Sequence, residues 1–169
     1  MTIRTDALRA SALKARTVGP RTLNEAKVQG VKTAFLCHSH RDAELAKGLV
    51  NLLSEAGWRV YIDWEDGSMP ETPNRETAER IQQKIRDLDF FLFLATASSM
   101  ASRWCPWEIG YADGRKARDQ LLVVPTTDGL TTHGSEYLQL YRRVDRSVQG
   151  VVEVWQPGQN YASVPIRTL

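Results

Sequence analysis

Short apolar runs alternate with helical patterns along most of this chain. Five segments have the apolar or alternating pattern of β-strands: 32–37, 58–63, 89–95, 121–125 and 151–155. Between them, apolar residues at helical spacing predict helices over 42–56, 78–88, 102–116 and 136–144. Alternation of this kind predicts an α/β fold with an open, mostly parallel five-stranded sheet, flanked by helices and joined by right-handed crossovers.

The helix and loop boundaries follow from capping and turn residues. Ser39 and Asp42 form a capping pattern before the first helix, Gly57 closes it, and Ser102 can cap a later one. Segments 64–74 and 96–103 are predicted loops, and the tail after Pro157 has no regular pattern. We therefore divide the chain into an extension at 1–30, one domain at 31–157 and a tail at 158–169.

The first 30 residues are basic. Their cations greatly outnumber their acids: Arg4, Arg9, Lys14, Arg16, Arg21 and Lys27 stand against Asp6 and Glu25. Such a segment is typical either of an organelle transit peptide or of a solvated, partly helical extension, and we favour the extension. Gly19-Pro20 is expected to break it in two.

Composition narrows the class of protein. With 169 residues, 42% of them hydrophobic and 25% charged, the chain suits one globular domain. A net charge of +2 favours neither nucleic acid nor an anionic membrane as a partner, and no apolar stretch is long enough to span a bilayer. The two cysteines lie in apolar surroundings, which suggests a cytoplasmic protein, and without a C-x-x-C pair we expect no metal site.

Polar residues follow several of the predicted strands. In an open parallel sheet, ligands bind beyond the carboxyl ends of the strands. Those ends carry His38-Ser39, Asp63-Trp64, 96–99 and Thr126-Thr127, with Glu108 close behind the third. The pattern therefore predicts one cleft lined by these residues.

Glu108 is the carboxylate best placed for chemistry. It lies in the segment S-R-W-C-P-W-E-I-G-Y, one or two turns into a helix that follows the most apolar strand. Trp104 and Cys105 precede it by four and three residues and share its helix face, whereas Trp107 points elsewhere and is expected in the core. Taken alone, a helix glutamate is more often a surface residue.

This segment resembles the S-x-W-C-x-x-E segment of Toll/interleukin-1 receptor (TIR) domains. The opening T-A-F-L-C-H-S-H-R-D, the strand V-Y-I-D-W and the apolar run 89–95 also look like TIR strands, so the resemblance covers roughly 31–155. It implies a flavodoxin-like TIR fold. The likeness is closer to stand-alone bacterial TIR proteins, including those of Thoeris anti-phage systems.

The resemblance implies an NAD⁺ glycohydrolase that gives ADP-ribose, a cyclic isomer or a related signal, with Glu108 as the catalytic residue. NAD⁺ would be a consumed substrate, so no cofactor is expected, and no dehydrogenase or P-loop motif is present. The substrate-binding candidates are His38, Ser39, Arg41, Asp63, Trp64, Trp104 and Cys105. Each has a structural alternative: Ser39 as a helix cap, Arg41 as a solvated cation, Trp64 and Trp104 as packing residues, and Cys105 as an inert buried thiol.

The sequence departs from the pattern of other TIR domains at two places, and these differences leave other functions open. The loop after the second strand reads D-W-E-D-G-S-M-P-E-T-P and lacks the R-D-x-x-P-G pattern of animal receptor adaptors. Cys37-His38-Ser39 stands where many relatives have a serine-aromatic pair. The alternatives are a non-catalytic TIR module that self-associates, a nucleoside deoxyribosyltransferase-like enzyme and, more remotely, a phosphoacceptor receiver domain. If the chain is instead a TIR enzyme of anti-phage defence, we expect it to self-associate and its product to activate a separate effector.

Overall fold

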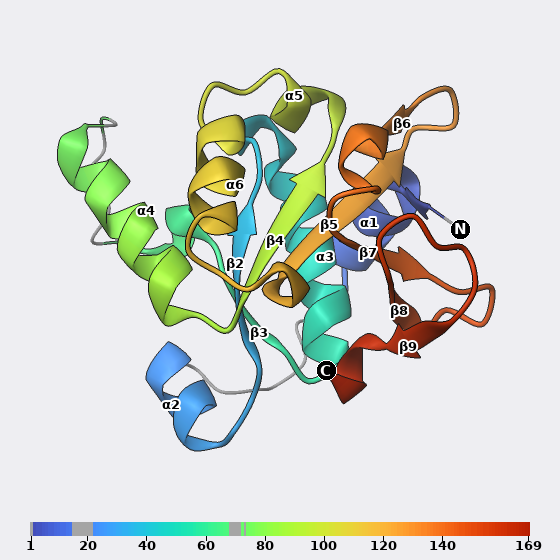
Figure 1. Cartoon of the computed structure of the whole chain (residues 1–169), viewed down its shortest axis with the longest axis horizontal. Coiled ribbons are helices and arrows are strands. Elements are labelled where there is room, and N and C mark those ends of the chain that lie inside the picture. The colour runs from blue at the N-terminus through green and yellow to red at the C-terminus, as the bar shows by residue number, and fades with distance from the viewer. Residues whose placement is uncertain (1, 15–21, 68–71, 73) are drawn as a thin grey trace.

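A computed structural model describes residues 2–14, 22–67, 72 and 74–169 (Figure 1). The predicted break at Gly19-Pro20 and part of the predicted loop 64–74 lie outside them. The strands are β1 Ile3–Arg4, β2 Thr33–Cys37, β3 Arg59–Tyr61, β4 Phe90–Ala95, β5 Leu121–Thr127, β6 Thr132–His133, β7 Arg142–Arg146, β8 Val152–Trp155 and β9 Ser163–Pro165. The α-helices are α1 Thr5–Ala12, α2 Leu23–Val28, α3 Ala43–Glu55, α4 Arg75–Asp87, α5 Ala97–Met100 and α6 Cys105–Asp113.

The described strands form one sheet in the order β3-β2-β4-β5-β7-β8-β9, with β1 and β6 also paired to β5. The pairs among β3, β2, β4, β5 and β7 are parallel, and β8 and β9 add antiparallel pairs at one edge. The predicted α/β fold with a mostly parallel sheet is confirmed. All five predicted strands are present, but the predicted number was wrong, because β1, β6, β7 and β9 extend the sheet.

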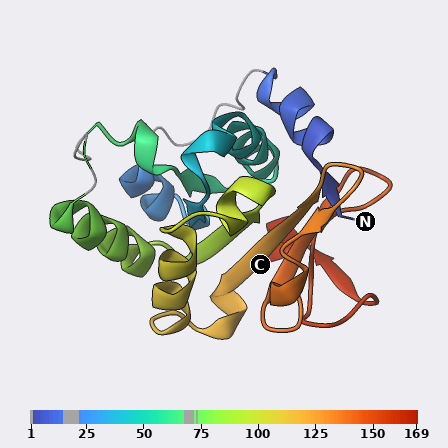
Figure 2. The same cartoon turned by 90° about the horizontal axis from the view of Figure 1, so that it is seen from above.

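The sheet is buried on both faces, which explains the apolar run of β4. Phe90, Leu92 and Leu94 belong to the core cluster that includes the buried face of α3. The alternating residues Phe91, Phe93 and Ala95 belong to the second cluster, with Ile109 of α6. Figure 2 shows α3 and α6 on opposite sides of the sheet. A central strand with both faces covered needs apolar residues at every position.

The predicted first helix is confirmed as α3. Its buried residues include Leu45, Leu49, Leu52 and Leu53, the apolar stripe visible in the sequence. Before it, a 3₁₀ turn at His40–Asp42 begins where the Ser39 hydroxyl accepts a hydrogen bond from the backbone N–H of Arg41. After it, Gly57 has φ of +87°, the left-handed conformation that ends helices with little strain in glycine.

Two local predictions were wrong. Segment 136–144 was expected to be helical, but a 3₁₀ turn at Ser135–Tyr137 is followed by β7. Tyr141 is buried in one core cluster and Val144 in the other, so this segment contributes to both sides of the sheet. The predicted loop 96–103 contains the short helix α5, whose N-terminus is capped by the Thr96 side chain.

The two ends of the chain also carry more structure than the sequence suggested. Ile3 of β1 pairs with Thr126 of β5, and Leu8 of α1 is fully buried where α1 packs on α3. The expectation of a solvated extension is therefore wrong for this part, although the boundary at residue 30 stays a prediction. At the other end β9 pairs with β8, and Ile166 is buried. Among the described residues, no helix is both long and apolar enough to cross a membrane.

Candidate active site

Glu108 is held inside the protein by the way α6 begins. The Ser102 hydroxyl accepts hydrogen bonds from the backbone N–H groups of Trp104 and Cys105, at 3.1 and 3.3 Å, which confirms its capping role. Pro106 occupies the first turn, where its missing N–H costs nothing. This start turns the Glu108 side chain towards the sheet, and the residue is only 6% exposed.

Burial changes the acidity of Glu108. Desolvation is the largest cause and raises its pKa from 4.5 to about 8. A hydrogen bond with the Cys37 thiol acts in the opposite direction, while charges on Cys105 and Asp63 raise the pKa further. In the protein without a ligand, Glu108 is therefore mostly protonated at neutral pH. A cation bound beside it would favour the carboxylate form.

Two thiols lie next to Glu108. Cys37 ends β2 and Cys105 begins α6; both are buried, and the Cys37 thiol donates to the carbonyl oxygen of Cys105 at 3.9 Å. Burial raises the pKa of Cys37 well above its ordinary value, so this thiol stays protonated and can donate. A hydrogen bond from Cys37 lowers the pKa of Cys105. Sequence reasoning named Cys105 but missed Cys37, whose place at a strand end beside His38 was the available signal.

His38 and Asp63 come together as the rule for strand ends predicted. The His38 ring is buried, its Nδ1 lies 3.0 Å from the carbonyl oxygen of Leu36, and its Nε2 lies 3.8 Å from Oδ1 of Asp63. The Trp64 ring packs against it almost at a right angle, at 83°, with ring centroids 4.5 Å apart. His40 approaches Oδ2 of Asp63 at 3.5 Å from the solvent side. Within the described part of the chain, no group of three or more potential metal ligands is arranged to hold an ion.

Asp42 and Thr96 fix the loops around these residues. The Thr96 hydroxyl donates to the buried carboxylate of Asp42, and the Thr96 side chain also caps α5. This contact joins the segment after β2 to the segment after β4, across 54 positions of the sequence. Asp42 was expected to complete a helix cap, but its side chain makes no capping hydrogen bond. Its role is to hold two strand-end loops together.

The remaining candidates lie further out. Ser39 is partly exposed, its hydroxyl caps the 3₁₀ turn, and Arg41 is exposed beside it. Trp64 is 38% exposed above His38, in a position to contact a ligand. Trp104 is 36% exposed and packs edge-on against Trp107, with ring centroids 5.5 Å apart. The expectation that Trp107 belongs to the core was wrong, because it is exposed to the same degree.

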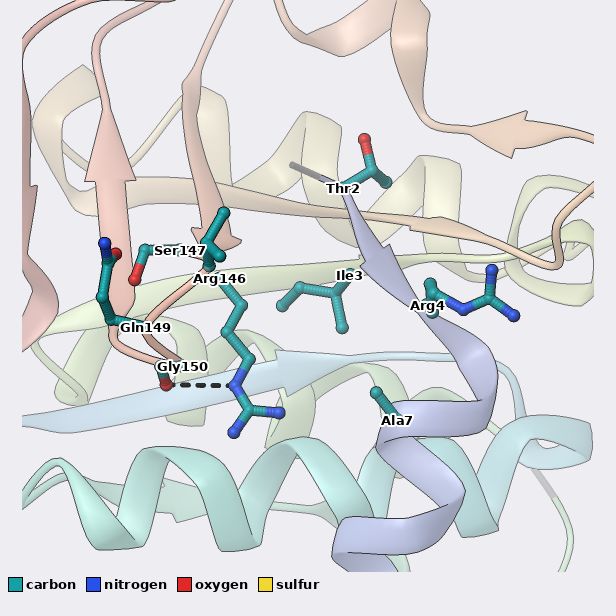
Figure 3. A pocket seen from close by; sticks show the side chains of 9 residues that line it. Thr2, Ile3, Arg4, Ala7, Arg146, Ser147, Gln149 and Gly150 are labelled. Carbon is teal, nitrogen blue, oxygen red and sulfur yellow. Dashed lines mark hydrogen bonds between the residues drawn. The ribbon is translucent and has the colours of Figure 1, made fainter.

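A separate cavity of about 400 Å³ lies between the start of the chain and the turn from β7 to β8 (Figure 3). Ile3 and Ala7 line one side, and residues 146–150 line the other. The Arg146 side chain crosses it and donates from Nε to the carbonyl oxygen of Gly150 at 3.0 Å. None of the candidate residues around Glu108 lines this cavity.

Comparison with known proteins agrees with the geometry. The family model for the TIR domain matches residues 34–152, most of the chain. A protein of Bacillus cereus (strain MSX-D12), named a probable 3′ cyclic ADP-D-ribose synthase ThsB′, is 36% identical over 110 residues, 63% of this chain and 57% of that protein. A protein of Cytobacillus dafuensis, named a putative cyclic ADP-D-ribose synthase TIR2, is 23% identical over 92 residues, 53% of this chain and 24% of that protein. The matches therefore span about half or less of these relatives.

Proposed function

Because the chain belongs to the TIR domain family, we propose that it is an enzyme that cleaves the bond between nicotinamide and ribose in NAD⁺. Its product would be a cyclic ADP-ribose, the class named for both relatives. The observation that carries the proposal is the buried carboxyl of Glu108, on a helix that begins beyond the strand ends, beside Cys37 and close enough to Asp63 for its charge to be felt. That is the edge of an α/β sheet where ligands bind.

Glu108 would act on the charge that develops during cleavage. Loss of nicotinamide leaves a ribose with oxocarbenium character, as in the cleavage of glycosides. The positive charge of the bound nicotinamide lowers the pKa of Glu108, which releases its proton to solvent, and the carboxylate then stabilises the developing ribose cation electrostatically. Two unit charges about 4 Å apart interact by roughly 4 kcal/mol at an effective dielectric of about 20. This corresponds to about a thousandfold in rate.

The neighbouring groups support this role. When Glu108 is ionised, the protonated Cys37 thiol can turn from the Cys105 carbonyl oxygen to the Glu108 carboxylate and orient it without neutralising it. Trp64 is 38% exposed, and an aromatic base could stack on its ring. The cation formed can be captured by water, giving ADP-ribose, or by a nucleophile of the same molecule, giving the cyclic product. We propose capture within the molecule.

The test is nicotinamide release from NAD⁺ by the purified protein and by Glu108→Gln, with the products separated by chromatography and identified by mass. The wild type should turn over NAD⁺, and Glu108→Gln should lose about a thousandfold in rate. Glu136→Gln, at an exposed position, is the matched control and should keep full activity. Equal rates for wild type and Glu108→Gln, or no release by concentrated wild type with a crowding agent present, would overturn the proposal.

One observation favours a second candidate, a non-catalytic TIR module that assembles with copies of itself. Trp107 stacks on Tyr111 and meets Trp104 edge-on, so aromatic rings lie along the outer side of α6. Exposed aromatic side chains are enriched at protein interfaces. In that case Trp107→Ala would lower the mass measured by light scattering, and Glu108→Gln would leave it unchanged. A deoxyribosyltransferase-like enzyme, the third candidate, would cleave deoxynucleosides and spare NAD⁺.

The biological setting follows from the same proposal. We place the reaction in the bacterial cytoplasm, where NAD⁺ is available and both buried cysteines remain free thiols. The product would act as a signal in anti-phage defence and activate a separate effector protein. Self-association of the TIR domain would accompany this activity.

A further inference from the structure

His38 contains a buried nitrogen atom without a hydrogen-bond partner. The side chain is 2% exposed, and its Nε2 makes no hydrogen bond in the described structure. The nearest charged atom is Oδ1 of Asp63, at 3.8 Å, which is beyond hydrogen-bond distance. Buried polar atoms in folded proteins nearly always have a partner, so an unpaired one beside a candidate site is informative.

The other ring nitrogen determines what Nε2 can do. Nδ1 lies 3.0 Å from the carbonyl oxygen of Leu36, and a carbonyl only accepts, so Nδ1 carries a hydrogen atom. Burial is the largest influence on the pKa of His38 and lowers it, so the ring is neutral at neutral pH. A neutral ring has one N–H, which makes Nε2 a hydrogen-bond acceptor.

Asp63 places a second acceptor beside the first. Its Oδ1 accepts a hydrogen bond from the backbone N–H of Trp64 at 2.9 Å, which fixes the carboxylate. The Trp64 ring packs on the imidazole and holds it as well. The Asp63 side chain is 18% exposed and can be reached from outside, whereas Nε2 of His38 is buried and can be reached only when the Trp64 ring packed on the imidazole moves aside. Two adjacent acceptors cannot satisfy each other. Asp63 already has the Trp64 N–H at Oδ1 and His40 at 3.5 Å from Oδ2, but Nε2 of His38 has no donor within the described structure, and a ligand can supply it.

We propose that His38 and Asp63 bind the vicinal diol of a ribose, with one hydroxyl donating to Nε2 of His38 and its neighbour to the Asp63 carboxylate. A cis-diol supplies two O–H donors side by side, and carboxylates bind ribose hydroxyls in the same way in dinucleotide-binding folds. A phosphate does not fit, because Asp63 would repel it. The identification of the ribose as part of NAD⁺ rests on the proposed function, whereas the preference for a diol does not.

The site should therefore select against ligands that lack a hydroxyl. Removing one hydroxyl leaves a fixed, largely buried acceptor without a donor, and a hydrogen bond to a charged or buried group is typically worth about 10- to 100-fold in affinity. A site built around hydroxyls rejects the analogue without them more strongly than an apolar pocket rejects a change in size. The acceptor pair thus becomes a specificity determinant.

The experiment measures binding and needs no turnover. Calorimetric titration of the full-length protein would compare AMP with 2′-deoxy-AMP, and nicotinamide mononucleotide with its 2′-deoxy analogue. The first pair contains only the adenosine ribose and the second only the nicotinamide ribose, so the pair that shows a 10- to 100-fold preference identifies the ribose that is bound. In parallel, long-range ¹H–¹⁵N NMR should show the Nε2 signal of His38 shifting when the diol ligand binds, and the 2′-deoxy analogue then shows whether the 2′-hydroxyl is the one that causes the shift.

Two variants test the acceptors separately. His38→Asn keeps a donor for the Leu36 carbonyl and removes Nε2, and Asp63→Asn keeps an acceptor for the Trp64 N–H and removes the charge. The variant that removes the acceptor of the 2′-hydroxyl should reduce the preference for the diol to within about threefold, whereas the other variant should keep the preference and bind both ligands more weakly. His133→Asn, in the separate ion pair with Asp128, is the matched control and should leave the preference unchanged.

The outcomes separate this inference from the proposed function. Equal affinity for diol and deoxy ligands in both pairs, or an unshifted His38 signal, would overturn the diol site even if NAD⁺ is cleaved. An unaltered preference in both His38→Asn and Asp63→Asn would overturn it too. A clear preference without NAD⁺ cleavage would support the site and reject only the proposed reaction.

Discussion

Glu108 is a carboxyl group whose charge depends on what is bound beside it. Without a ligand, burial favours the neutral acid up to about pH 8. A nicotinamide ribose carries the opposite charge and favours the carboxylate, so substrate binding and proton release are linked. Burial makes the ionised form of this carboxyl unfavourable in the empty site. A bound cation offsets that desolvation free energy, so the site favours the cationic transition state over the empty site.

This linkage predicts the pH dependence of NAD⁺ cleavage. Since the carboxylate is the active form, kcat/KM should rise about tenfold per pH unit between pH 6 and the pKa of about 8, and level off above it. The value of kcat should level off at a lower pH, because the bound cation lowers the pKa. Initial rates from pH 5.5 to 9.5 measure both. A kcat/KM that is constant from pH 6 to 9 would show that Glu108 does not act as a carboxylate.

The same group predicts how stability depends on pH. The pKa of Glu108 is 4.5 in an unperturbed chain and about 8 in the folded protein, so between these values the folded state binds the extra proton. Its contribution to the free energy of unfolding therefore falls as pH rises, by up to about 1.4 kcal/mol per unit. Glu108→Gln cannot titrate, so its stability relative to wild type should increase from pH 5 to pH 8.

Urea unfolding at pH 5, 6.5 and 8 would measure this difference. Glu136→Gln is the control, and its stability relative to wild type should stay the same at the three pH values, because the residue is exposed. A constant difference for Glu108→Gln as well would mean that Glu108 has the same pKa in the folded and unfolded chains. The buried site would then carry a charge in the absence of ligand.

At the scale of elements, the sequence predicted the parts whose pattern is local. Apolar runs predicted β2, β4 and β5, an alternating pattern predicted β3, and β8 was also predicted; the rule for strand ends correctly placed His38 beside Asp63. Segment 136–144 failed because its spacing of apolar residues fits a helix, while its pairing with β5 is a long-range property. The contact between Asp42 and Thr96 spans 54 positions and leaves no local pattern.

The packing of α1 on α3 depends on a single glycine. A Cβ built on Gly48 would lie 1.9 Å from the backbone oxygen of Leu8, so only glycine permits this approach. Gly48→Ala should lower the free energy of unfolding by about 1–3 kcal/mol, because α1 must move outwards. Gly110→Ala in α6 has free space around its Cβ and is the matched control. It should be neutral or gain up to about 1 kcal/mol in helix propensity.

Chemical denaturation of both variants separates packing from propensity. If Gly48→Ala were as stable as Gly110→Ala, the two helices would not be in backbone contact in solution. A lower stability only for Gly48→Ala would confirm that the N-terminal helix is packed as the structure shows. The sequence alone gave no indication of this, since Gly48 lies within an otherwise regular helical pattern.

At the scale of the whole molecule, the N-terminal segment completes the sheet and one core cluster. Ile3 and Leu8 belong to the same cluster as α3 and the central strands, and β1 pairs with the carboxyl end of β5. The segment also forms one wall of the cavity in Figure 3. We therefore expect residues before the family match at 34–152 to unfold together with the rest of the domain.

Leu8→Ala tests this view. Leu8 is fully buried, so its truncation should lower the free energy of unfolding of the whole protein by about 2–5 kcal/mol. Leu13, which follows the end of α1, is 86% exposed, and Leu13→Ala should change stability by less than about 0.5 kcal/mol. Calorimetry of both variants, with a single transition expected in each, measures the effect. If Leu8→Ala left the main transition unchanged, the segment would be an appendage, and residues 31–157 would fold alone as the sequence suggested.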